Sequence, residues 1–189
     1  TRLNRNPASR MQTEQLLPDQ MGLARAAILL AGGQVVAIPS ETVYGLAGDA
    51  RNGQAVARIY AAKGRPSFNP LIVHVPDLDA ARPIAQITPE AEALAEAFWP
   101  GALTLVVPLE ADSGIASLVT AGLPTVGIRV PAHPVAQAVL RELTPKLRIT
   151  GYMVQIGTLS IDRDRIDLDE IGRNDFFCPD PGAVAEWTE

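Results

Sequence analysis

Short apolar runs alternate with capped, helix-like segments through most of this chain, and that alternation limits the folds it can adopt. Strands are expected at 34–38, 71–75, 103–109 and 125–130, and helices at 19–31, 52–62, 88–98 and from Pro134 onward. Asp19, Asn52 and Thr88 are residues of the kind that cap helix N-termini, and each stands at the start of one of those helices. Strands alternating with helices favour an α/β fold, with helices packed on a mixed sheet.

The composition agrees with one packed globular unit. The 189 residues are 47% hydrophobic and 20% charged, which is enough apolar material for a core. With one cysteine and two histidines, an internal disulfide, a cysteine zinc cluster and a His-rich metal site are not expected. The longest apolar stretch, 26–39, is broken by two glycines and too short to cross a bilayer. No signal peptide is recognised, so a cytoplasmic protein without a membrane partner is predicted.

The acidic net charge of −5 is concentrated near the end of the chain. Residues 144–189 contain five basic and nine acidic residues, so the main body is nearly neutral and could still form a local basic cleft. Aromatic residues make up only 5%, which argues against binding of single strands mainly by base stacking.

Common nucleotide-binding and hydrolase motifs are absent, so candidate sites are sought in polar loops beside strand ends. The first such loop, 39–45, reads P-S-E-T-V-Y-G and directly follows an expected strand. Its hydroxyls and aromatic ring could hold a small polar ligand. An ordinary turn from a strand to a helix is the alternative, and the residues alone favour it.

A second candidate combines Lys63 and Arg65, two cations at the end of an expected helix, with Asn69 and His74 shortly after them. The cations could neutralise a triphosphate, because arginine matches phosphate oxygens in a forked geometry. They could equally complement the C-terminal helix dipole. His74, on an apolar strand, is more typical of a satisfied core histidine than of a ligand-binding residue.

A third candidate is Arg129, which alternates within an otherwise apolar strand. A charge in that setting needs a partner, because burying it unpaired is costly. The partner could be an internal carboxylate such as Glu41, or a substrate carboxylate held through both oxygens. The nearby Trp99-Pro100-Gly101 is interpreted as a packing corner.

Read in order, these segments resemble the YrdC-like family. The motifs that carry the resemblance are P-S-E-T-V-Y-G-L at 39–46, K-G-R-P-S-F-N-P-L-I-V-H at 63–74, W-P-G-A-L-T at 99–104, T-A-G-L at 120–123 and T-V-G-I-R-V-P-A-H-P at 125–134. Each motif is weak alone, but their order and spacing over residues 21–143 are specific.

The resemblance implies a twisted mixed sheet flanked by helices, with a concave, positively charged face. It also implies a threonylcarbamoyl-AMP synthase, a nucleotidyltransferase that joins L-threonine, bicarbonate and ATP. Mg²⁺ would accompany the ATP, and no resident metal is expected. The product would serve tRNA threonylcarbamoyladenosine formation through threonylcarbamoyl-transfer proteins, and tRNA or double-stranded RNA are possible partners.

Site residues also follow from the resemblance, by matching each motif position to this sequence. The resemblance assigns catalysis to Lys63 and Arg65. ATP binding is assigned to Lys63, Arg65, Asn69 and Thr125, and threonine binding to Ser40, Thr42, Tyr44, His74 and Arg129.

The resemblance stops at Leu143. Family members continue with an S-x-N loop that completes the ATP site beside K-x-R, and no such motif occurs in 144–189. The expected organisation is a flexible lead-in at 1–18, a YrdC-like domain at 19–143 and a divergent or truncated acidic tail at 144–189. A shifted reading frame, foreign sequence and real divergence all explain the break, and the loss of pattern favours a shifted frame.

Three functions remain open at this point. The first is the synthase, with its activity in doubt because the S-x-N loop is missing. The second is a carbamoyl-adenylating domain of a carbamoyltransferase, and the third a nucleotide- or RNA-binding remnant without catalysis.

Overall fold

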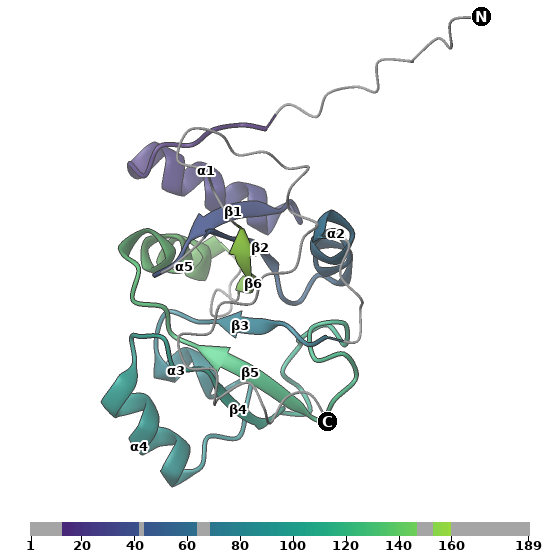
Figure 1. The fold of residues 1–189 in the computed structure, drawn as a ribbon, viewed down its shortest axis with the longest axis vertical. Coiled ribbons are helices and arrows are strands. Elements are labelled where there is room, and N and C mark those ends of the chain that lie inside the picture. Colours follow the sequence, from purple (N-terminus) through teal and green to yellow (C-terminus); the bar gives the residue numbers. More distant parts are fainter. Residues whose placement is uncertain (1–12, 42–43, 64–68, 147–152, 160–189) are drawn as a thin grey trace, which may run out of the picture.

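A computed structural model describes residues 13–41, 44–63, 69–146 and 153–159, with the backbone alone for 144–146 and 153–159. Its centre is a six-stranded sheet in the order β1-β2-β6-β3-β5-β4 (Figure 1). The strands are β1 Val36–Pro39, β2 Tyr44–Asp49, β3 Ile72–His74, β4 Leu105–Pro108, β5 Thr125–Arg129 and β6 Met153–Leu159. The sheet and its helices confirm the α/β fold.

The strand pairing is mixed, as expected, and one pair determines where the site lies. Strands β3 and β5 run parallel, with Ile72 opposite Gly127 and His74 opposite Arg129. The other pairings, β1–β2, β2–β6, β6–β3 and β5–β4, are antiparallel. Because β3 and β5 run in the same direction, their C-terminal residues meet at one edge of the sheet.

The described residues contain five helices: α1 Gln20–Ala31, α2 Gly53–Lys63, α3 Leu78–Ala81, α4 Pro89–Phe98 and α5 Pro134–Lys146. Four of them, α1 to α4, begin directly after a residue whose side chain accepts a hydrogen bond from a backbone N–H of the first turn. The carboxylate of Asp19 accepts a hydrogen bond from the Gly22 N–H at 2.8 Å, and the Asn52 side chain accepts from the Gln54 N–H at 3.0 Å. Gly33, with φ of +75°, follows α1 in the left-handed region that glycine tolerates best.

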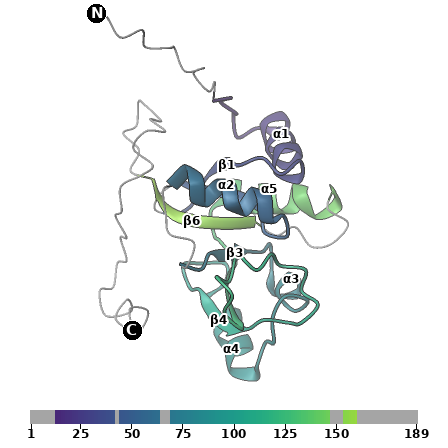
Figure 2. The same cartoon turned by 90° about the vertical axis from the view of Figure 1, so that its right-hand side faces the viewer.

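Two hydrophobic cores lie on opposite faces of the sheet. On one face, Val73, Val126 and Ile128 pack with residues of α2, α3 and α4. On the other face, α1 and α5 pack on Ile38 and Ala47, and this second core contains no described residue of β3, β4 or β5. Figures 1 and 2 show α1 and α5 beside the β1–β2 end of the sheet, and α3 and α4 beside β4.

Side-chain alternation then fixes which residues point away from the first core. Since Val73, Val126 and Ile128 belong to that core, their neighbours His74, Gly127 and Arg129 point to the opposite face. Val106, which pairs with Gly127, is 46% exposed there. On this face α1 and α5 cover β1 and β2. His74 and Arg129, on β3 and β5, lie on the same face but outside the second core.

The sequence-based elements are confirmed with small shifts at their ends, and three elements were missed. Strand β2 was missed, so the interpretation of 39–45 as a strand-to-helix turn is wrong: the segment connects two antiparallel strands. Its sequence, Y-G-L-A-G-D, lacks β-branched residues because the strand is packed closely. A Cβ on Gly48 would lie 3.1 Å from the Ile59 side chain.

Two further differences concern the tail and the short helix α3, which has four residues. The tail, in which no strand was delimited from the sequence, contributes β6 at 153–159, and β6 lies between β2 and β3 (Figure 1). In α4 the buried residues are Ala91 and Ala95, whereas Leu94 and Phe98 are exposed. No helix in the described ranges has the length and apolar character needed to cross a bilayer.

The second core makes a testable contribution to stability. Leu140, fully buried between α5 and α1, loses both burial and packing in Leu140→Ala, which should lower the free energy of unfolding by about 2–5 kcal/mol. Urea denaturation measures this change. The matched control is Leu94→Ala, at a leucine that is 45% exposed. It should cost less than about 1 kcal/mol, and equal losses in the two variants would contradict the assigned packing.

Candidate active site

The residues assigned to threonine include two that the fold places side by side. His74 ends β3 and Arg129 ends β5, and the two are register partners in the parallel pair. They are 55 positions apart in the sequence yet share one face of the sheet, beyond the part covered by α1 and α5.

Arg129 is held by two protein groups. Its Nε donates to the Gly101 carbonyl oxygen at 2.9 Å, and its Nη2 donates to Oε2 of Glu41 at 2.6 Å. The Arg129 and Glu41 side chains are 18% and 25% exposed. Of the two partners that the sequence left open for Arg129, the structure therefore contains the internal carboxylate, and the Trp99-Pro100-Gly101 corner contributes a carbonyl to the same cluster.

Glu41 is the carboxylate that connects this cluster to the β1–β2 turn. Besides contacting Arg129, its Oε1 accepts from the Ala132 N–H at 2.6 Å. Burial acts to raise the pKa of Glu41, but the backbone N–H groups and the charge of Arg129 together lower that pKa below its usual value. Glu41 is therefore ionised at neutral pH, and the pair with Arg129 carries no net charge.

His74 is a buried, neutral base beside that pair. His74 is only 3% exposed. This burial, and to a lesser extent the charge of Arg129, lowers the pKa of its imidazole to about 4. Its Nδ1 lies 3.2 Å from the Ile72 carbonyl oxygen, which can only accept, so Nδ1 carries the proton. The other ring nitrogen, Nε2, is then a hydrogen-bond acceptor.

The described residues assigned to ATP lie at the start of β5, in the segment before β3 and at the end of α2. Thr125 and Arg129 point to the same face from opposite ends of β5, about 13 Å apart by the rise of a strand. Asn69 precedes β3, and its carbonyl accepts from the Tyr60 hydroxyl at 2.6 Å. Lys63, the last residue of α2, is 8% exposed. The fold thus brings together His74 and Arg129 but not all the assigned residues.

The remaining assigned residues border the β1–β2 turn or lie outside the description. Tyr44 pairs with Pro39 across that turn and is 39% exposed, and Ser40 is half-buried beside it. Thr42 and Arg65 fall outside the described residues. Sequence reasoning missed the Gly101 carbonyl and the Ala132 N–H, because nearly every residue has these backbone groups and the residue type does not show which of them enter a site.

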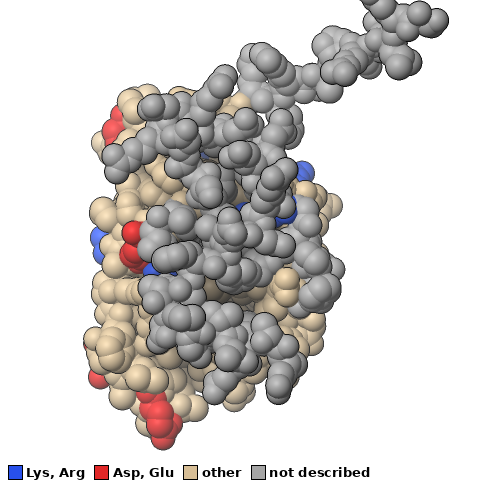
Figure 3. Space-filling view, in the orientation of Figure 1, with Lys and Arg blue, Asp and Glu red and all other residues tan. Residues whose placement is uncertain are grey.

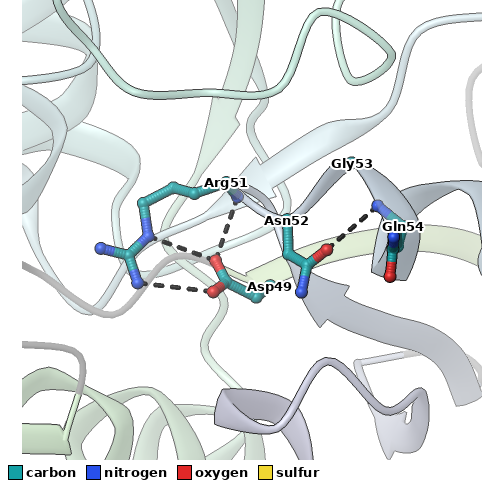
Figure 4. A pocket seen from close by; sticks show the side chains of 5 residues that line it. All are labelled: Asp49, Arg51, Asn52, Gly53 and Gln54. Carbon is teal, nitrogen blue, oxygen red and sulfur yellow. Dashed lines mark hydrogen bonds and ion pairs between the residues drawn. The ribbon is translucent and has the colours of Figure 1, made fainter.

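A shallow hollow elsewhere contains none of the assigned residues. It is lined by Asp49, Arg51, Asn52, Gly53 and Gln54 at the start of α2 (Figure 4), where Arg51 is already paired with Asp49 at 3.3 Å. No group of three or more potential metal ligands occurs within the described ranges. On the part of the molecular face that Figure 3 leaves uncovered, described basic and acidic side chains form small separate groups rather than a continuous basic patch.

The comparison with known families is decisive for classification. The sequence profile of the Sua5/YciO/YrdC family, described as telomere recombination, matches residues 28–177. The chain belongs to this family. The match continues past Leu143, where the recognisable motifs stop.

Individual relatives agree with this membership. Threonylcarbamoyl-AMP synthase of Bacillus subtilis is 50% identical over 131 residues, which are 69% of this chain and 38% of the relative. The crystal structure of Pyrococcus abyssi Sua5 complexed with L-threonine is similar with a TM-score of 0.66 and 38% identity, covering 76% of this chain and 39% of the other. The chain therefore spans about two fifths of the length of these Sua5/YciO/YrdC relatives.

A different enzyme matches a shorter part of the chain. Chorismate synthase of Paracoccus denitrificans is 61% identical over 61 residues, which are 32% of this chain and 17% of that enzyme. A length of 61 residues cannot fit outside the range 28–177 matched by the family profile, so the two similarities overlap.

The buried imidazole predicts a pH dependence of stability. The pKa of His74 is about 4 in the folded protein, whereas an unperturbed histidine has a pKa of 6.5. As the pH falls, His74 is therefore protonated in the unfolded chain before it is protonated in the folded protein. The contribution of neutral His74 to the free energy of unfolding is fully present above pH about 6.5. It is lost as the pH falls toward about 4, and the loss amounts to up to about 3 kcal/mol. Urea denaturation between pH 4 and 7 measures this loss.

The matched variant His74→Gln has no group that titrates in this range. Its stability should fall less steeply over the same interval, and the difference between the two curves isolates the histidine. Parallel curves for the two proteins would show that His74 is not held neutral by its surroundings.

Proposed function

We propose that this chain carries the site of a threonylcarbamoyl-AMP synthase, with the amino-acid half formed by the ends of β3 and β5. The observation that carries the proposal is the pairing of neutral His74 with Arg129 on one face of the sheet. It is supported by relatives named threonylcarbamoyl-AMP synthase and by a relative crystallised with L-threonine.

In the proposed reaction the protein positions reactants and neutralises charge. The threonine amine and bicarbonate form a carbamate and release water. A carbamate oxygen then attacks the α-phosphorus of ATP, the bond to the bridging oxygen of the β-phosphate breaks, and pyrophosphate leaves with the electron pair. No covalent enzyme intermediate is required, which suits a site of cations and hydrogen-bonding groups.

Each assigned residue has a role in that scheme. Arg129 would hold the threonine carboxylate, and His74 Nε2 would accept a hydrogen bond from the threonine hydroxyl or amine. Ser40, Thr42 and Tyr44 would line the same pocket from the β1–β2 turn. Lys63 and Arg65, with Asn69 and Thr125, would bind ATP together with its Mg²⁺.

The ATP half of the site lacks the S-x-N loop, and the chorismate synthase similarity bears on the reason. The family motifs lie within 21–143, so we infer that the similarity to chorismate synthase covers the C-terminal end of the chain. Its 61 residues exceed the 46 that follow Leu143, so the similarity also includes at least 15 residues of the motif range. A shifted reading frame would not retain 61% identity to a natural enzyme, so foreign sequence replaces the shifted frame as the explanation we favour. Strand β6 then belongs to the foreign segment.

A nucleotide- or RNA-binding protein without catalysis is the second candidate, and the missing loop favours it. Such binding to phosphates would weaken steeply with salt. In either case we propose a cytoplasmic protein, and in the synthase case transfer proteins and tRNA would consume the product. The carbamoyltransferase-domain alternative requires carbamoyl phosphate in place of threonine and bicarbonate.

Pyrophosphate release separates these functions. The synthase predicts release from Mg²⁺-ATP only when L-threonine and bicarbonate are both present. Release that requires carbamoyl phosphate would favour the carbamoyltransferase domain. Binding of ATP without turnover would leave the non-catalytic protein as the function.

Variants of the two halves should have opposite effects on the substrates. Lys63→Ala or Arg65→Ala should raise the KM or Kd for ATP by about tenfold or more, corresponding to about 1.4 kcal/mol, and leave threonine binding nearly unchanged. Arg129→Ala should do the reverse. Equal losses for both substrates in all three variants would show that these side chains are structural.

A further inference from the structure

We propose that Glu41 is a positioning residue, which ties the β1–β2 turn to the end of β5 and orients Arg129 for an amino-acid carboxylate. The proposal rests on the proposed function for the identity of the ligand. No role for Glu41 follows from the family motifs quoted above, beyond its place in P-S-E-T-V-Y-G-L.

The contacts of Glu41 connect three parts of the fold. One carboxylate oxygen accepts from Arg129 Nη2 at 2.6 Å, across 88 positions of sequence, and the other accepts from the Ala132 N–H at 2.6 Å, across 91 positions. Both carboxylate oxygens therefore accept hydrogen bonds, one from the Arg129 side chain at the end of β5 and one from the backbone that leads to α5. Because Glu41 directly follows Ser40, these two contacts also fix where this side of the turn lies.

The geometry of the guanidinium explains what this arrangement achieves. Nε and Nη2 share one side of the planar group, and the Gly101 carbonyl and Glu41 occupy that side. Gly101 is fixed in turn, because its N–H donates to the Val130 carbonyl at 2.8 Å. Arginine has five N–H donors, and with one side anchored, the end formed by Nη1 and the second hydrogen of Nη2 is oriented for a ligand carboxylate.

Glu41 also has an opposing effect, since its negative charge repels a second carboxylate at the same guanidinium. The two effects have opposite consequences for binding. If orientation outweighs repulsion, removal of the charge weakens binding of L-threonine; if repulsion outweighs orientation, removal strengthens it. Our proposal requires the first result.

Calorimetric titration of the full chain with L-threonine tests this. Glu41→Gln can still accept from Ala132 but presents no charge to Arg129, and it should raise the Kd by about tenfold, the loss expected for one charge-assisted hydrogen bond. Glu41→Asp keeps the charge but is one methylene shorter, so it cannot span Arg129 and Ala132 together and should behave like Glu41→Gln. The control Glu14→Gln removes the exposed partner of Arg25 and should leave the Kd unchanged.

Two results would overturn the proposal: an unchanged or lower Kd in Glu41→Gln, or wild-type behaviour of Glu41→Asp, which would mean that charge alone matters. If the wild-type chain does not bind L-threonine, the proposed function fails and orientation of Arg129 is judged separately by NMR. Exchange of the Arg129 Nε–H with solvent should then be about tenfold or more faster in Glu41→Gln than in wild type, as expected when a charge-assisted hydrogen bond is lost. Equal exchange would overturn the positioning role.

Discussion

A partly buried arginine at the end of a parallel strand is the constraint on which the site depends. Arg129 cannot stay unpaired where only 18% of its side chain is exposed, so the fold supplies Glu41 and the Gly101 carbonyl. Those partners draw the β1–β2 turn and the Trp99–Gly101 corner toward the end of β5. Burial, reinforced by the same positive charge, keeps His74 neutral. One charge therefore holds the β1–β2 turn and the Trp99–Gly101 corner at the end of β5 and adds to the effect of burial on the adjacent base.

The sheet places this cluster and also reveals an unusual feature of the chain. Strand β6 joins the β1–β2 pair to the β3–β5–β4 group, yet it lies where the family motifs have stopped and where we place the similarity to chorismate synthase. Backbone hydrogen bonding in a sheet does not depend on side-chain identity, so a segment of foreign sequence can fill a strand position. An ATP site, in contrast, needs particular side chains, and strand pairing alone does not provide them.

The sequence predicted most of the fold because local chemistry decides most of it. Capping residues such as Asp19 and Asn52, and β-branched runs such as those of β4 and β5, act over a few positions and can be read directly. Strand β2 was missed because it contains small residues of low strand propensity, such as the fully buried Ala47 and Gly48, which packs closely against Ile59. In the site, the need of Arg129 for a partner was predictable, whereas the choice of Glu41, 88 positions away, and of the Gly101 and Ala132 backbone groups depends on tertiary structure.

The central claim is that Arg129 recognises a carboxylate on the face it shares with His74. Calorimetric titration with L-threonine and with L-threoninamide, which lacks the carboxylate, tests it most directly. The account predicts that the wild-type chain binds L-threonine at least about tenfold more tightly than the amide, which corresponds to about 1.4 kcal/mol, and that Arg129→Gln abolishes this preference. Equal affinity of the wild-type chain for both compounds, or a preference that survives in Arg129→Gln, would contradict it.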